Sequence, residues 1–142
     1  AKKIIYGCDS RGDGDSPYLT RITLLETPWG NLYLHYFHRS DADDLHDHPW
    51  AFISLILWRG YIEDCRHEDP ESPLSYRTRR RKLPGMILFR RASHIHRVEL
   101  IHGRPAITLV WTFNKVREWG FWTGKGQAIW QRWIEYFEER GC

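Results

Sequence analysis

The stretch LHDHPWAFISLILWRG, residues 45–60, places His46 and His48 one residue apart, directly before an apolar run that ends at Gly60. On a β-strand, residues i and i+2 point to the same side, so both imidazoles can face one point while Asp47 faces away. Imidazole is the commonest metal ligand among side chains. Two histidines alone also fit a polar strand end, so the stretch leaves both interpretations open.

A second HxH, formed by His94 and His96, narrows this choice. It lies in PGMILFRRASHIHRVEL, residues 84–100, whose apolar and β-branched residues favour strands. A third ligand can therefore come from His96 and join His46 and His48. Because His94 precedes His96 by two residues and can share its face, it is a candidate fourth ligand.

The first stretch resembles the first motif of the cupin family, which reads HxH, four residues, Glu, six residues and Gly. His46, His48 and Gly60 stand at the matching positions, and Ile53 stands where the family has its Glu.

The second stretch resembles the second cupin motif, PGDxxxxPAGxxHxxxN, from Pro84 and Gly85 to His96 at the motif histidine. It departs from the motif at Arg91, Ser93 and Leu100. At the metal motif, the chain resembles the thiol dioxygenase branch of cupins, which uses three histidines.

This resemblance implies a mainly β fold, a cupin-type antiparallel β-barrel or jelly roll, with one divalent transition metal held by His46, His48 and His96. Iron(II) is favoured, and Zn, Ni, Cu or Mn also suit such ligands. The implied function is that of a mononuclear non-haem oxygenase or dioxygenase, an oxidoreductase. Without the Glu the site is more positive, which favours a small anionic substrate.

Two other functions stay open. One is a non-catalytic cupin module that binds a small molecule or sugar, and the other is a metal-dependent isomerase or epimerase that uses a histidine as acid or base. Candidate substrate contacts, chosen for their closeness to the motifs, are Trp50, Tyr61 and Arg97.

The strand pattern predicts a single domain over residues 1–142, with the barrel over about 18–114. Roughly seven to nine short strands alternate with turn signals. Two hairpins are predicted: YLTRITLLE with NLYLHYFH through TPWGN, and FISLILW with YIEDC through RG.

The C-terminal segment predicts an amphipathic helix over about 127–140. Apolar residues recur at helical spacing, and Gly141 is placed to end the helix. The predicted apolar face consists of Ile129, Trp130, Trp133, Ile134 and Phe137.

The three cysteines, Cys8, Cys65 and Cys142, are far apart, which argues against a disulfide framework and for the reducing cytoplasm. No apolar run reaches the roughly 18 residues of a membrane span. Both faces of the strand at 52–58 are apolar, so we expect a homodimer or the C-terminal helix to cover one of them.

The basic run RTRRRK, Arg77–Lys82, contributes much of the net charge of +3. Few aromatics are interleaved with it, so nucleic acid is not the favoured partner. On a strand, Arg80 and Lys82 face one side and the other three arginines face the opposite side. One of these sets could line a cavity and bind a carboxylate or phosphate.

His35 and His38 lie three residues apart and so face opposite sides of a strand, which predicts structural roles.

Overall fold

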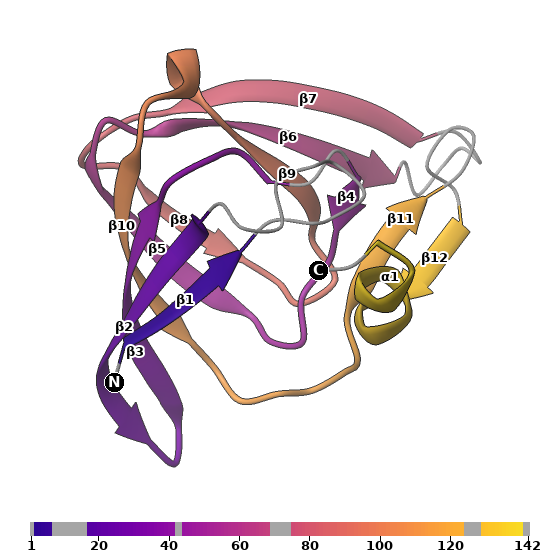
Figure 1. Cartoon of the computed structure of the whole chain (residues 1–142), viewed down its shortest axis with the longest axis horizontal. Coiled ribbons are helices and arrows are strands. Elements are labelled where there is room, and N and C mark those ends of the chain that lie inside the picture. The colour runs from indigo at the N-terminus through magenta and orange to yellow at the C-terminus, as the bar shows by residue number, and fades with distance from the viewer. Residues whose placement is uncertain (1, 7–16, 42–43, 69–74, 124–128, 141–142) are drawn as a thin grey trace.

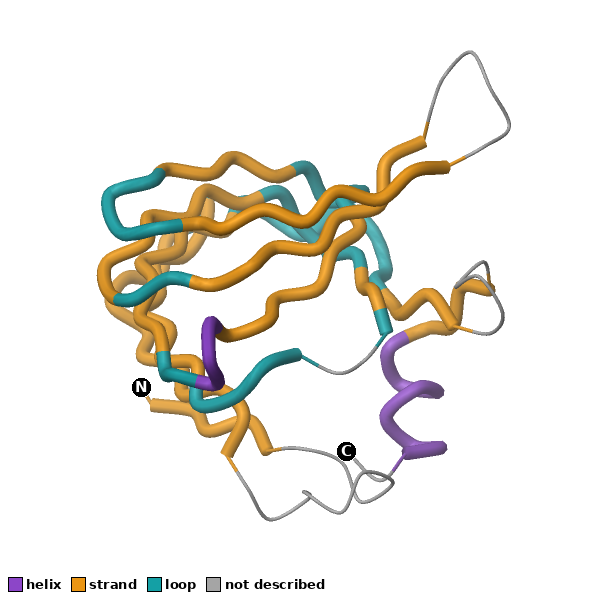
Figure 2. The backbone as a smooth tube through the Cα atoms, turned by 90° about the horizontal axis from the view of Figure 1, so that it is seen from above, coloured by secondary structure: helices purple, strands orange, loops and turns teal. Residues whose placement is uncertain are grey.

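The computed structural model describes residues 2–6, 17–41, 44–68, 75–123 and 129–140. Within these ranges, twelve strands form two antiparallel six-stranded sheets, followed by one α-helix (Figures 1 and 2). The predicted mainly β fold with a C-terminal helix is confirmed, with more strands than the sequence indicated.

The first sheet has the order β1-β2-β3-β10-β5-β8, and the second has the order β12-β11-β4-β9-β6-β7. The strands of the first sheet are β1 (Lys2–Tyr6), β2 (Pro17–Thr27), β3 (Gly30–Phe37), β10 (Ala106–Thr112), β5 (Phe52–Trp58) and β8 (Ile87–Arg90). Those of the second are β12 (Ile129–Arg132), β11 (Gly120–Thr123), β4 (Leu45–His46), β9 (Ile95–Leu100), β6 (Tyr61–Glu68) and β7 (Ser75–Lys82). Since β1, β11 and β12 belong to these sheets, the sheets extend beyond the expected 18–114 at both ends.

One of the two predicted hairpins is confirmed and the other is wrong. Strands β2 and β3 pair from Thr27 opposite Gly30 onward. Strands β5 and β6 lie in different sheets, because β5 pairs with β10 and β8 whereas β6 pairs with β9 and β7. Arg59 and Gly60, with φ of 61° and 84°, turn the chain from one sheet into the other.

The hydrophobic core lies between the two sheets. Burial alternates along β10, where Ala106, Thr108, Val110 and Thr112 are buried and the residues between them are partly exposed. This alternation defines the inner face of the sheet. The core cluster draws on both sheets and consists of Leu19, Phe37, Ile56, Tyr61, Leu88, Val98, Leu100 and Ala106.

The C-terminal helix, α1, spans Trp133–Arg140 and is shorter than predicted. Residues 129–132 instead form β12, where they satisfy their backbone by pairing with β11, and the indole of Trp130 donates a hydrogen bond to Asp47 at 3.0 Å. Gly141, predicted to end the helix, lies outside the described residues. No helix in the described part of the chain is long and apolar enough to cross a membrane.

Helix α1 packs beside β11 and β12 (Figure 1), where the buried Tyr136 stacks on Phe121 with ring centroids 3.7 Å apart. It does not cover the outer face of β5, where Leu57 is 46% exposed. The expected cover for that face is therefore not the helix, and the homodimer stays a prediction.

The crossing between the sheets predicts a specific sensitivity at Gly60. At Gly85 φ is 90°, and an added Cβ would meet nothing within 4 Å. Gly85→Ala therefore destabilises the fold only through its left-handed backbone, by about 1–2 kcal/mol. A Cβ at Gly60 would also lie 2.1 Å from the carbonyl oxygen of Lys82. We expect Gly60→Ala to lower the free energy of unfolding by at least about 1 kcal/mol more than Gly85→Ala in urea titrations. Equal losses would contradict this account of the turn.

Candidate functional site

Three histidines converge at one end of the interior. Donor atoms of His46, His48 and His96 all lie within 4.8 Å of one another. The ring centroids are 5.1 Å apart for His46 and His48, 4.8 Å for His46 and His96, and 4.7 Å for His48 and His96. The structure thus brings together the three residues that the two sequence motifs singled out.

Strand pairing and one buried carboxylate position the first two histidines. Strand β4 pairs with β9 so that His46 lies opposite His96. Between His46 and His48, the Asp47 side chain points the other way and is 1% exposed. It accepts hydrogen bonds from the Gly120 backbone N–H at 2.8 Å and the Trp130 indole at 3.0 Å. Because these bonds hold the Asp47 side chain on one face of the segment, the imidazoles of His46 and His48 must lie on the opposite face.

A second carboxylate orients the His96 ring, and a third lies near the His46 ring. Nδ1 of His96 donates to Glu63 Oε2 at 2.6 Å, and Nδ1 of His46 lies 3.8 Å from Asp41 Oδ2. A histidine whose Nδ1 faces a carboxylate has Nε2 left to bind a metal. Nδ1 of His48 is buried and has no hydrogen-bond partner among the described residues. The cluster therefore offers imidazole nitrogens that lack protein partners.

His46 and His48 are neutral in this environment. Burial lowers the pKa of His46 and of His48 well below the usual value, and the neighbouring His96 lowers both further. A neutral imidazole keeps the lone pair that a metal requires. The residues present therefore fit a divalent transition metal.

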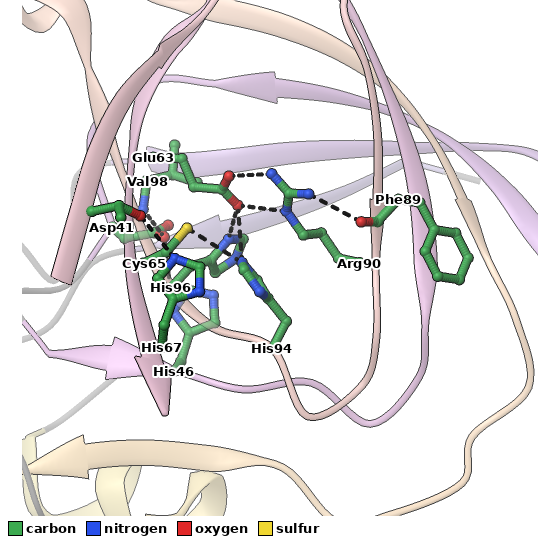
Figure 3. Close-up of polar contacts among 11 residues, drawn as sticks. Asp41, His46, Glu63, Cys65, His67, Phe89, Arg90, His94, His96 and Val98 are labelled. Atoms are coloured by element: carbon green, nitrogen blue, oxygen red, sulfur yellow. Dashed lines mark hydrogen bonds and ion pairs between the residues drawn. The ribbon is translucent and has the colours of Figure 1, made fainter. Parts of the chain in front are cut away.

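Glu63 is the centre of a charged network beside the cluster (Figure 3). Its side chain is 1% exposed and accepts two hydrogen bonds from Arg90, at 2.5 Å and 3.0 Å, and one from His94 at 3.2 Å. Burial alone would raise the pKa of Glu63, but the hydrogen bonds from His94, His96 and Arg90 outweigh it and lower the pKa below the usual range. The carboxylate is therefore ionised, and Arg90 balances its charge.

A second group of donors, formed by Glu63, Cys65 and His94, lies beside the first. Cys65 Sγ is 3.5 Å from His94 Nε2. Burial raises the pKa of the Cys65 thiol to about 12, so the thiol is protonated in the metal-free protein. With Arg90 already bound to Glu63, this group is better suited to hydrogen bonding than to a metal. His94, the candidate fourth ligand, belongs to this network.

Aromatic side chains wall the three histidines. Phe52 lies 4.8 Å from His48 between ring centroids, and Trp50 stacks on His48 at 5.9 Å. Ile53, which stands at the motif's Glu position, is partly exposed and lies in register with Trp111 on the outer face of the sheet. The alternation of β5 turns Phe52 inward, so an aromatic ring occupies the place beside the histidines.

The other candidate substrate contacts lie elsewhere. Tyr61 is 4% exposed in the hydrophobic core, with its ring 6.2 Å from Phe37. Arg97 follows His96 along β9 and so projects to the opposite face of the sheet.

Sequence reasoning missed Glu63 and Asp41, because neither belongs to a motif.

A cavity of about 970 Å³ adjoins this region. Glu63, Cys65 and His94 line it, whereas the three converging histidines do not. The Glu63 carboxylate, bonded to His96, therefore lies between the cavity and the three-histidine cluster.

The two antiparallel sheets enclose a shared core, and the two HxH segments meet where His46 of β4 lies opposite His96 of β9. This arrangement is that of a cupin fold. No protein-family model matches the sequence, and no curated protein matches it. Solved structures do match. A cupin domain from Bordetella pertussis Tohama I has a TM-score of 0.50 and 11% identity over 68% of this chain and 94% of its own.

A putative mannose-6-phosphate isomerase from Ralstonia eutropha JMP134 has a TM-score of 0.55 and 20% identity, covering 70% of this chain and 87% of its own. The iron(II) form of HppE has a TM-score of 0.54 and 15% identity, covering 79% and 56%. At these low sequence identities, the structural similarity establishes only the fold. The cupin fold that the sequence motifs predicted is therefore confirmed.

His35 lies outside the cluster and has the structural role that was predicted. It is 7% exposed on β3 and accepts a hydrogen bond from Arg21 Nε at 3.0 Å. Burial, and then the charge of Arg21, lower its pKa from 6.5 to about 3. Between these two pH values the unfolded chain binds a proton that the folded chain does not.

The free energy of unfolding must therefore fall as the pH is lowered from 6.5 towards 3, with His35 contributing about 1.4 kcal/mol per pH unit. We expect His35→Gln to reduce the slope of unfolding free energy against pH in this window by about 1.4 kcal/mol per pH unit, which corresponds to one proton. Urea titrations at several pH values measure the slope. Identical slopes for both proteins would contradict a neutral His35.

Proposed function

We propose that this protein is a metal-dependent cupin enzyme, a mononuclear non-haem iron oxygenase that acts on a small anionic molecule. The observation that carries the proposal is the convergence of three imidazoles from the two HxH segments, one of which, His48, has a buried Nδ1 with no hydrogen-bond partner among the described residues. A buried polar atom without a partner is costly unless a ligand supplies one.

Each residue around the three histidines has a distinct task. His46, His48 and His96 would hold the metal, and Glu63 and Asp41 would fix two of the rings. Phe52 and Trp50 would exclude water from one side. Bound iron(II) supplies redox chemistry with dioxygen and open positions for a substrate.

The charge of the site favours an anionic substrate. Three neutral ligands leave the charge of a divalent ion uncompensated, and the nearby carboxylate of Glu63 is already balanced by Arg90. The structural likeness to HppE in its iron(II) form is consistent with iron, although Zn, Ni, Cu or Mn would also suit these ligands.

Metal uptake tests the ligands directly. After anaerobic reconstitution and desalting, elemental analysis should find about one iron per chain in the wild type, as expected for one three-histidine site. His46→Ala, His48→Ala and His96→Ala should each retain little or none. His38→Ala is the matched control, because His38 is bonded to Thr20 at 2.7 Å and lies outside the cluster.

Equal iron content in all four variants would overturn the site. Oxygen consumption by the loaded enzyme with thiol or carboxylate substrates then tests the reaction. Turnover that survives complete removal of oxygen would favour an isomerase or epimerase. Ligand binding without metal or turnover would favour a non-catalytic binding module.

The orienting role of Glu63 predicts a separate effect. Glu63→Gln keeps the shape of the side chain but removes the charge that fixes the tautomer of His96, so we expect metal affinity to fall about 10–100-fold. Glu99→Gln is the control, since Glu99 pairs with Arg79 on the outer face. Competition with a chelator measures both affinities in folded protein. Unchanged affinity in Glu63→Gln would mean that Glu63 does not support the metal.

A further inference from the structure

Strand β7 separates its basic residues between two faces. Arg77 and Arg79 lie on the outer face, where Arg77 binds Asp64 through two hydrogen bonds and Arg79 pairs with Glu99. Arg80 lies opposite the buried Glu63 of β6, so it is on the other face of the strand, where it is exposed and lines the cavity of about 970 Å³.

Lys82 follows the same alternation. It lies opposite the buried Tyr61, on the face that Arg80 shares, and also lines the cavity. Arg91, at the start of the loop after β8, is a third lining cation. The cavity thus collects positive charge from β7 and from the loop after β8.

The carboxylates in the cavity wall do not balance this charge. Glu63 is bound by Arg90 at 2.5 Å, and Asp47 is bound by Arg117 at 3.1 Å. A further lining arginine, Arg66, lies over the ring of Trp122 at 5.0 Å.

Arg80, Lys82 and Arg91 have no carboxylate partner among the described residues, although they share one hollow. Like charges gathered in a concave site attract an anion more strongly than the same charges on an open surface.

We propose that this cavity binds an organic phosphate. A phosphate monoester carries up to two negative charges and several acceptor oxygens, so it can bridge Arg80, Lys82 and Arg91 better than a single carboxylate can. Tyr76 and Phe89 also line the cavity and offer aromatic faces to an apolar group on the same molecule.

The cavity extends to the network beside the three histidines. Glu63 and His94 line it, and Glu63 contacts His96. A phosphate held at Arg80 and Lys82 would leave the rest of the molecule directed towards that network. That this molecule is the substrate rests on the proposed function, whereas phosphate binding itself does not require the metal.

Titration of the full chain, after removal of metal by EDTA, tests the proposal. Phenyl phosphate, inorganic phosphate and benzoate serve as probes, with binding followed by calorimetry. We expect phenyl phosphate to bind tightest and benzoate to bind weakest, and we expect the affinity to fall as NaCl is added. The double variant Arg80→Gln/Lys82→Gln should lose about tenfold or more in affinity for phenyl phosphate.

The double variant Arg79→Gln/Arg81→Gln is the matched control. It removes the same charge from the same strand on the outer face, and it should bind phenyl phosphate within about twofold of the wild type. Urea titrations would confirm that both variants fold. Equal losses in the two variants, or equal affinity for benzoate and phenyl phosphate, would overturn the proposal. So would tight binding of a single-stranded oligonucleotide that depends on Arg79 and Arg81.

The two proposals can fail separately. Phosphate binding without iron uptake would remove the oxygenase and leave the phosphate site. Iron uptake without phosphate binding would remove the phosphate site and leave the metal centre. Phosphate binding that is lost when metal is removed would place the anion on the metal, and would also overturn the site at Arg80 and Lys82.

Discussion

The arrangement of the interior depends on the buried carboxylate of Asp47. In HxH the middle residue must point away from the histidines, and here that residue is an acid with 1% exposure. A buried acidic side chain at such a position is stable only with several hydrogen-bond donors, and the Gly120 N–H, the Trp130 indole and Arg117 supply them. The bonds from Gly120 and Trp130 join the residue directly after β4 to β11 and β12. The short segment of β4 and the two residues after it thus orients the two histidines and connects the C-terminal strands to the sheet.

The interior is divided between an apolar end and a polar end. Side chains such as Val98 and Leu100 fill the core, while His96, on the same strand and the same face, lies among the histidines. Period-two alternation makes this possible, because one inner face of β9 carries both kinds of residue along its length. Glu63 has the same relation to Tyr61 on β6. The core therefore supports the site directly, without an intervening loop.

Sequence predicted the converging histidines because HxH spacing and strand alternation are local properties. It could not predict Glu63, since Glu63 and Asp64 are adjacent and either could have faced inward. The same ambiguity affected Phe52 and Ile53, because both faces of β5 are apolar and only pairing with β10 fixes the phase. The hairpin between β5 and β6 was wrong for a related reason. A Gly with positive φ fits a tight hairpin and a crossing between sheets equally well.

The C-terminal segment shows how tertiary contacts override periodicity. Its apolar spacing fits a helix, yet residues 129–132 pair with β11, and only residues from Trp133 onward are helical. The indole of Trp130 reaches Asp47 from β12. A residue read as part of an apolar helical face thus donates to the carboxylate that fixes the histidines. Hydrophobic patterning ignores the indole N–H of Trp130. That N–H favours the strand, because its hydrogen bond to the buried side chain of Asp47 stabilises the fold more than packing of the indole ring on a helix surface would.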